Sequence, residues 1–208
     1  MTIKTLKEAK EETGGGVTNK NSKMPEFTYD LSAWECITGA KLVNVKGSTC
    51  EGCYAQTGNF LRYRHASVGV SHKKHLESLY NPKWVEAMVT LIKSRRNYKK
   101  GKDYFRWHDS GDIQGIIHLC NIMQVAELTP DCDHWLPTRE NAFLKAFVEG
   151  GGIVPSNMYV RVSALMIDGL PPTKFAKELS SHDNVKGFIG TSTVHKNEEA
   201  IGSSCIAY

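Results

Sequence analysis

The sequence predicts a single-domain parallel β/α barrel or partial barrel, with a cysteine-rich metal loop near its N-terminus. Segments with strand and helix patterns alternate about five times, which favours a parallel sheet with helices outside it. The chain has 208 residues, the usual size of one domain, and no linker or internal repeat divides it. Polar residues follow several strands, as in TIM-like barrels, whose ligands bind at the carboxyl ends of the strands.

The first half of the chain is the less regular part. Residues 1–25 are polar and contain the run Gly14-Gly15-Gly16, so we expect a flexible N-terminal arm there. A β/α-barrel-like catalytic domain is expected to follow over residues 26–208. It begins with a short strand at 40–45, and a helix is expected at 82–94 because apolar residues recur along one of its faces.

The second half carries the clearest alternation of elements. The expected elements are strand 104–107, helix 116–128, strand 134–139, helix 142–149, strand 158–164, helix 173–179 and strand 186–191. Ligands of parallel β/α folds sit beyond the carboxyl ends of the strands. The residues that follow the strands 104–107 and 158–164 are therefore the first candidates for a site.

Composition limits the classes of function. No run approaches the roughly 18 apolar residues of a membrane span, and the N-terminus lacks the apolar core of a signal peptide. We therefore expect a cytoplasmic protein with no membrane partner. The net charge of +4 permits a polyanionic partner without requiring one. The six cysteines, in a reducing compartment, are expected to bind metal or do chemistry more often than to form disulfides.

Three cysteines form the first candidate site. Cys36, Cys50 and Cys53 are spaced C-x13-C-x2-C, and a C-x2-C pair suits zinc or an iron–sulfur cluster. A further ligand could be Cys205 or a histidine such as His72. Three cysteines with one open position would make a catalytic site, whereas four ligands would make a structural one; the simplest alternative is a set of loop thiols. Of the others, Cys120 is expected in the core, and Cys132 is left open.

The second candidate site is the polar segment His108-Asp109-Ser110-Gly111-Asp112, directly after the strand 104–107. Two carboxylates confined together acquire different pKa values, so Asp109 and Asp112 are candidates for a nucleophile and a general acid or base. Gly111 would let a ligand approach the backbone closely. The alternative is a turn in which Asp112 caps the following helix.

Three arginines and one histidine are expected around this segment. Arg106 and His108 alternate along one strand, so both are expected to point toward the interior or mouth of the barrel. Arg139 and Arg161 lie at or in other strands and could join Arg106 in binding an anion. Three guanidinium groups that converge would repel one another and lose hydration, so their arrangement would cost free energy unless a ligand is bound.

These segments together resemble a phage family called "Gene product eighty-eight". The resemblance rests on Cys50-Glu51-Gly52-Cys53-Tyr54-Ala55, on residues 105–112, and on Tyr159-Val160-Arg161-Val162-Ser163, and it covers roughly residues 19–208. It implies a protein of the host cytoplasm. A second cysteine-rich segment usually follows near the C-terminus in that family, whereas this chain ends shortly after Cys205, so a partner chain is a candidate for completing the metal site.

The segment Asp109-Ser110-Gly111-Asp112-Ile113-Gln114 is similar to a strand end of the tRNA-guanine transglycosylases and their DNA-modifying relatives, which are β/α barrels with a zinc site. This resemblance implies exchange of guanine for a 7-deazaguanine in DNA, or in tRNA. Asp109 would be a general acid/base or a group that recognises the base, and Asp168 would attack the sugar. Such chemistry needs a flipped nucleotide in a positive channel. In this chain, however, the cysteines precede the expected barrel strands.

The segment from Cys36 to Tyr54 is called the cysteine loop below. With Tyr54 directly behind Cys53, it also resembles the cysteine loop of radical S-adenosylmethionine enzymes. That resemblance implies a [4Fe–4S] cluster, with the segment Ser110-Gly111-Asp112 at the cofactor's amino group. Thirteen residues separate Cys36 from Cys50, where that family has three. A third hypothesis is a non-catalytic zinc-containing module that binds nucleic acid. The sequence favours base exchange on phage DNA over radical chemistry by a small margin.

Overall fold

The structure is a computed structural model that describes residues 3–18, 27–95 and 103–196. Its centre is a five-stranded parallel sheet, in which the strands lie side by side in the order of the chain. The strands are β1 (Phe27–Tyr29), β2 (Asp103–Trp107), β3 (Cys132–Thr138), β4 (Met158–Ser163) and β5 (Phe188–Ser192). The expected parallel α/β class is confirmed, and all four strands expected in the second half are present.

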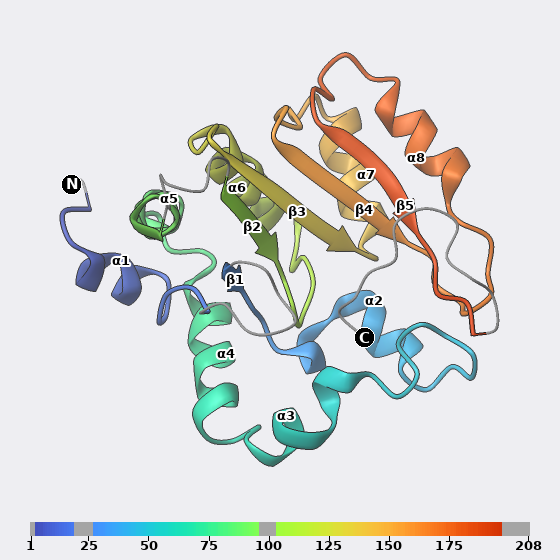
Figure 1. The fold of residues 1–208 in the computed structure, drawn as a ribbon, viewed down its shortest axis with the longest axis horizontal. Coiled ribbons are helices and arrows are strands. Elements are labelled where there is room, and N and C mark those ends of the chain that lie inside the picture. Colours follow the sequence, from blue (N-terminus) through green and yellow to red (C-terminus); the bar gives the residue numbers. More distant parts are fainter. Residues whose placement is uncertain (1–2, 19–26, 96–102, 197–208) are drawn as a thin grey trace.

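The helices α5 (Trp84–Arg95), α6 (Ile116–Glu127), α7 (Asn141–Glu149) and α8 (Thr173–Ser180) connect or precede the strands, and each packs against the next. Parallel crossover connections are right-handed, so a sheet with sequential strand order places its crossover helices on one face. Figure 1 shows α6 and α7 behind the strands. The core accordingly lies between one face of the sheet and this helix layer.

Side chains alternate between the two faces of the sheet. On the helix face Trp107, Leu136 and Val160 are fully buried against apolar side chains of the helices. On the other face a row of residues in register crosses the whole sheet: Thr28, Arg106, Trp135, Tyr159 and Phe188. This second face, called the open face below, keeps part of its aromatic surface exposed.

The strand expected at residues 40–45 is wrong, because α2 (Ile37–Leu42) occupies the first half of that segment and a turn occupies the rest. The first strand is instead β1, which pairs in parallel with β2. The apolar residues between 42 and 45 resemble a strand, but a tertiary contact of the first turn of α2, described below, stabilises the helix. The cysteine loop therefore follows the first strand of the sheet.

The connection between β1 and β2 is long and also contains α3 (Gly58–Arg62) and α4 (Ser67–Ser78), which lie below the sheet in Figure 1. Within the segment expected as an arm, residues 6–12 form α1, which is capped by the Thr5 side chain and packs on α5. No helix within the described ranges is long and apolar enough to cross a membrane.

Candidate functional site at the carboxyl ends of the strands

The segment 108–112, called the acidic turn, is bound to the end of β1. The backbone N–H of Asp109 donates to Asp30 Oδ1 at 2.8 Å, and the Ser110 hydroxyl donates to the Leu31 carbonyl at 2.8 Å. The other oxygen of Asp30 accepts the hydroxyls of Thr18 and Thr28. Asp30 is buried and fixes the path of the chain after β2.

Gly111 lies in close contact with Leu31, the second residue after β1. Its φ is +86°, and a Cβ at this position would lie 2.6 Å from the Leu31 Cβ and 2.9 Å from the Leu31 carbonyl oxygen. The neighbour that requires a glycine here is therefore Leu31. The close approach at Gly111 is thus made by Leu31, whereas the sequence analysis expects a ligand at this position.

Asp112 joins the ends of β2 and β3. Its Oδ1 accepts the Thr138 hydroxyl at 2.7 Å and the Ile113 N–H at 2.8 Å, and its Oδ2 accepts the Arg139 N–H at 2.9 Å. Burial raises the pKa of this carboxyl to about 6, against these hydrogen bonds, which lower it. The expectation that Asp112 caps the next helix is wrong, because Gly115 occupies the N-cap position of α6.

His108 does not share the direction of Arg106. The strand ends at Trp107, and His108 has a φ of +60°, which interrupts the alternation of side chains. Its buried ring lies 5.2 Å from the ring of His118 on α6, measured between centroids. The expectation that both side chains face the mouth of a barrel is therefore wrong for His108, which packs on the helix side.

Asp109 is the member of the acidic turn whose side chain reaches the surface. Arg106 Nη1 lies 3.5 Å from Asp109 Oδ1, and the two side chains are 15% and 25% exposed. The Tyr54 hydroxyl donates to the backbone carbonyl of Asp109 and is 3.2 Å from its Oδ1. Tyr54 directly follows Cys53, so this contact connects the acidic turn to the cysteine loop.

The three thiols lie beside the acidic turn. A Cβ built on Gly39 would be 2.8 Å from Cys36 Cβ, 3.6 Å from Cys36 Sγ and 3.8 Å from Cys50 Sγ, so both cysteine side chains pack on the same side of Gly39. Burial raises the pKa of the Cys36 thiol well above its usual range, and the charges of Asp112, Cys53 and Cys50 add to this effect. Burial also raises the pKa of Cys50. The two candidate sites of the sequence are thus one region of the molecule.

Glu140 is a positioning residue that the sequence does not indicate. Its carboxylate accepts the backbone N–H of Thr38 at 2.7 Å and the Thr38 hydroxyl at 2.9 Å. Cys36 is the N-cap residue of α2, and its side chain makes no hydrogen bond to the first turn of the helix. The Thr38 N–H of that turn is paired instead with Glu140, which lies outside the helix. Glu140 is buried, and it holds the turn that carries Cys36.

The other end of the cysteine loop is bound to the ends of β3 and β4. The Thr49 N–H donates to the Leu165 carbonyl at 2.9 Å, and the Thr49 hydroxyl donates to the Ala164 carbonyl at 3.1 Å. Arg139 Nε donates to Thr49 Oγ1 at 3.0 Å. The loop therefore spans the carboxyl edge of the sheet from β1 to β4.

The remaining candidates lie in different places. Arg161 is on the open face, where it donates to the Thr191 carbonyl at 3.3 Å. Asp168 lies in the loop after β4, where it accepts the Lys196 N–H at 3.0 Å and is 3.5 Å from His195 Nδ1. Cys205 lies outside the described residues. Cys120 was expected in the core and is exposed on α6, whereas Cys132 is buried.

Cys36, Cys50 and Cys53 are free thiols. In the part of the chain that the structure describes, no three histidine, cysteine or acidic side chains are gathered as ligands of one metal ion. Thiols with raised pKa values bind a metal as thiolates only after losing their protons, so binding at these cysteines would release protons. Three cysteines in one region supply sulfur donors of the kind that zinc and iron–sulfur centres use.

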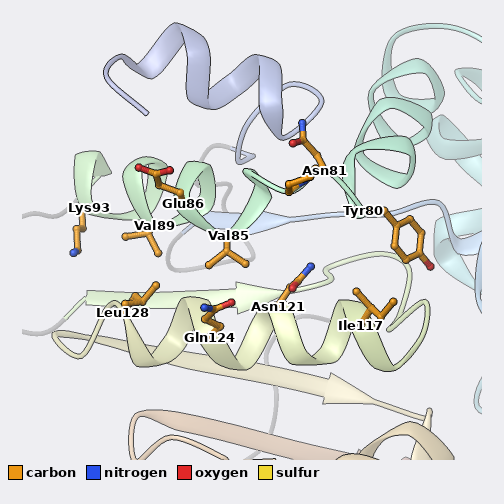
Figure 2. Close-up of a pocket in the computed structure, with 11 residues that line it drawn as sticks. Tyr80, Asn81, Val85, Glu86, Val89, Lys93, Ile117, Asn121, Gln124 and Leu128 are labelled. Atoms are coloured by element: carbon orange, nitrogen blue, oxygen red, sulfur yellow. The ribbon is translucent and has the colours of Figure 1, made fainter. Parts of the chain in front are cut away.

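A groove between α5 and α6 lies away from these residues. It has a volume of about 660 Å³, and Figure 2 shows Val85 and Val89 of α5 opposite Ile117 of α6 and Leu128, which follows α6. Its wall also includes the exposed side chain of Tyr80. None of the candidate site residues lines it.

Comparison with known proteins places the chain in a family. The model of the family Gene product 88 matches residues 2–186, a span that includes the cysteine loop, the acidic turn and strand β4. No curated protein and no solved structure matches the chain. The matched span covers most of the sequence, and this chain belongs to the phage family Gene product 88.

Proposed function

We propose that this protein is an enzyme in which Cys36, Cys50 and Cys53 bind a [4Fe–4S] cluster that works with S-adenosylmethionine. The observation that carries the proposal is the position of the thiols. They follow β1, the first strand of the sheet, and they lie beside Asp112, which follows β2. Radical S-adenosylmethionine enzymes, which the cysteine loop resembles, use the same two strand ends for cluster and cofactor.

The sheet supports the same proposal at the level of architecture. Its strands are parallel and in sequential order, and its crossover helices are expected on one face. We propose that this sheet is part of a partial β/α barrel, whose ligands would lie at the carboxyl ends of the strands. The proposed cluster would lie at that edge, between the acidic turn and the loop that follows β4.

Cys36, Cys50 and Cys53 would hold the cluster through their thiolates. With an external electron donor, the cluster would supply the electron for reductive cleavage of S-adenosylmethionine. Tyr54 directly follows Cys53, its hydroxyl lies 3.2 Å from Asp109 Oδ1, and both side chains reach the surface. We assign them to orienting the amino-acid part of the cofactor, while Asp112 and Ser110 hold the strand ends in place.

The test is cleavage of S-adenosylmethionine by the protein after anaerobic loading with iron and sulfide and reduction with dithionite. We expect release of 5′-deoxyadenosine by the native chain and none by Cys50→Ala. Cys120→Ala is the matched control, because this thiol is exposed on α6, and it should retain the native rate. Iron-loaded native protein that releases no more product than Cys50→Ala would refute the proposal.

Base exchange on nucleic acid is a second candidate, with zinc in place of the cluster and 7-deazaguanine as the incoming base. The observation that favours it is the partly exposed carboxylate of Asp109 beside Arg106 at the end of β2. Asp168, the nucleophile it requires, makes its observed contacts with Lys196 and His195. Uptake of a labelled 7-deazaguanine into guanine-containing DNA by zinc-loaded protein would favour this function over radical chemistry.

A further inference from the structure

The open face of the sheet presents aromatic rings to solvent on neighbouring strands. Trp135, Tyr159 and Phe188 stand in register on β3, β4 and β5, and the rings of Tyr159 and Phe188 are 6.3 Å apart. Tyr159 is 40% exposed and Phe188 is 46% exposed. Tyr104, on the same face of β2, is 55% exposed. Aromatic surface gathered on one face in this way indicates an interaction site.

Arginine side chains lie over two of these rings. The Arg106 guanidinium is 4.7 Å from the centroid of Trp135, and that of Arg161 is 5.1 Å from the centroid of Phe188. A guanidinium has five N–H donors, more than the contact of Arg161 with the Thr191 carbonyl uses. Carboxylates are also present on this side: Asp109 is paired with Arg106, and Asp133 is in register with Tyr104.

Three neighbouring rings with guanidinium groups over two of them fit a ligand that carries both flat bases and phosphates. Bases stack on aromatic side chains whatever their sequence, and arginines bind the phosphates between them. A double helix hides the faces of its bases, so the matching ligand is single-stranded. We infer that the open face binds single-stranded nucleic acid, with one base on Tyr159, neighbouring bases beside Trp135 and Phe188, and phosphates at Arg106 and Arg161.

This inference deepens the proposed function and rests on it, because it names the substrate class of the same site. The row leads from β5 across the sheet to Arg106, whose partner Asp109 contacts Tyr54 beside the thiols. A strand lying along the row would bring a nucleotide to the cysteine loop. The binding itself needs neither metal nor cofactor, so it can be tested separately from the chemistry.

The experiment is fluorescence anisotropy of a labelled oligo-dT and an oligo-U of about 12 nucleotides with metal-free protein, within the range of site sizes for single-strand-binding folds. We expect binding that weakens as salt rises, because phosphate contacts release counterions. Trp135→Ala and Tyr159→Ala should each weaken it by about 5- to 100-fold, the effect of losing one stacked base. The relative affinities for the two oligonucleotides identify DNA or RNA as the preferred source.

The matched control is Tyr80→Ala, which removes an exposed tyrosine from the groove between α5 and α6 and should leave the affinity unchanged. Trp135→Phe keeps a stacking ring and should retain most of the binding. The inference is wrong if folded native protein binds neither oligonucleotide, or if Tyr159→Ala and Tyr80→Ala behave alike. It is also wrong if the native chain is a dimer that Tyr159→Ala separates, since a second copy would then occupy the face. None of these results affects the proposed cluster, which is measured by its iron content.

Discussion

The free energy of unfolding of this protein is expected to fall by several kcal/mol as the pH is lowered from about 6.5 to about 4. The cause is a set of buried, neutral histidines. Burial lowers the pKa of His108 to about 4 and that of His134 to about 3. The unfolded chain takes up protons near pH 6.5, whereas the folded chain does so only at lower pH. The contribution of these two histidines to the free energy of unfolding is therefore fully present above pH 6.5. It is lost as the pH falls through their pKa values in the folded chain.

The size of the effect follows from the shifts. One pKa unit corresponds to about 1.4 kcal/mol, so the complete contributions are about 3 kcal/mol for His108 and about 5 kcal/mol for His134. Asp112 acts in the opposite direction, because its pKa is raised to about 6, and its contribution is lost as the pH rises through that value. The two histidines together outweigh this single carboxyl.

Urea unfolding of metal-free protein at a series of pH values measures this dependence. His134 accepts a hydrogen bond from Trp107 Nε1 and has Thr129 Oγ1 at 2.8 Å from its Nε2. His134→Gln should reduce the dependence on pH, whereas His65→Gln, at an exposed position, should leave it unchanged. Equal stability of the native chain at pH 6.5 and pH 4 would contradict the account of neutral buried histidines.

Glu140→Ala is expected to weaken metal binding at the cysteines by about 10- to 100-fold, although Glu140 would not be a ligand. The variant removes both acceptors of Thr38 and leaves its N–H and hydroxyl unpaired. The first turn of α2 then loses the carboxylate that accepts its Thr38 N–H. Cys36, the N-cap residue of this helix, is no longer held beside Cys50. Metal affinity by competition with a chelator measures the effect.

Two further variants separate positioning from general stability. Glu140→Gln keeps an acceptor for the Thr38 N–H and should restore much of the affinity. Glu149→Ala removes a partly exposed glutamate from the same helix and should have no effect. The rate at which Cys36 reacts with a thiol reagent should rise in Glu140→Ala. If Glu140→Ala binds metal as tightly as the native chain, Glu140 does not position the site.

The regular part of the fold can be predicted from the sequence because local patterns determine it. The strands β2 to β5 and the helices α5 to α8 all have the expected periodicity, and their residues agree with the expected ranges to within a few positions. The segment 40–45 was wrongly predicted as a strand because its apolar residues suit one. The residue that stabilises α2 is Glu140, which is 102 residues from Thr38 in the sequence. β1 is only three residues long, too short for a pattern.

In the candidate site, too, the features that follow from general rules can be predicted, and those that depend on contacts distant in the sequence cannot. That the thiols and the acidic turn belong together follows from the rule that parallel strands end at one edge. The roles within the turn do not follow, because each depends on a contact distant in the sequence. Gly111 meets Leu31, Asp112 meets Thr138, and the left-handed backbone of His108 turns its ring away from Arg106. Asp30 and Glu140 are single acidic residues in no motif, so only the structure identifies them.

The central claim is that Cys36, Cys50 and Cys53 hold one iron–sulfur cluster, and metal content with the visible spectrum tests it most directly. Protein purified without oxygen, or loaded with iron and sulfide, should be brown and should carry about four iron atoms per chain, as a [4Fe–4S] cluster requires. Replacing any one of the three cysteines by alanine should remove the colour. A colourless protein that holds a single zinc ion through these cysteines, or that binds no metal at them, would contradict the claim.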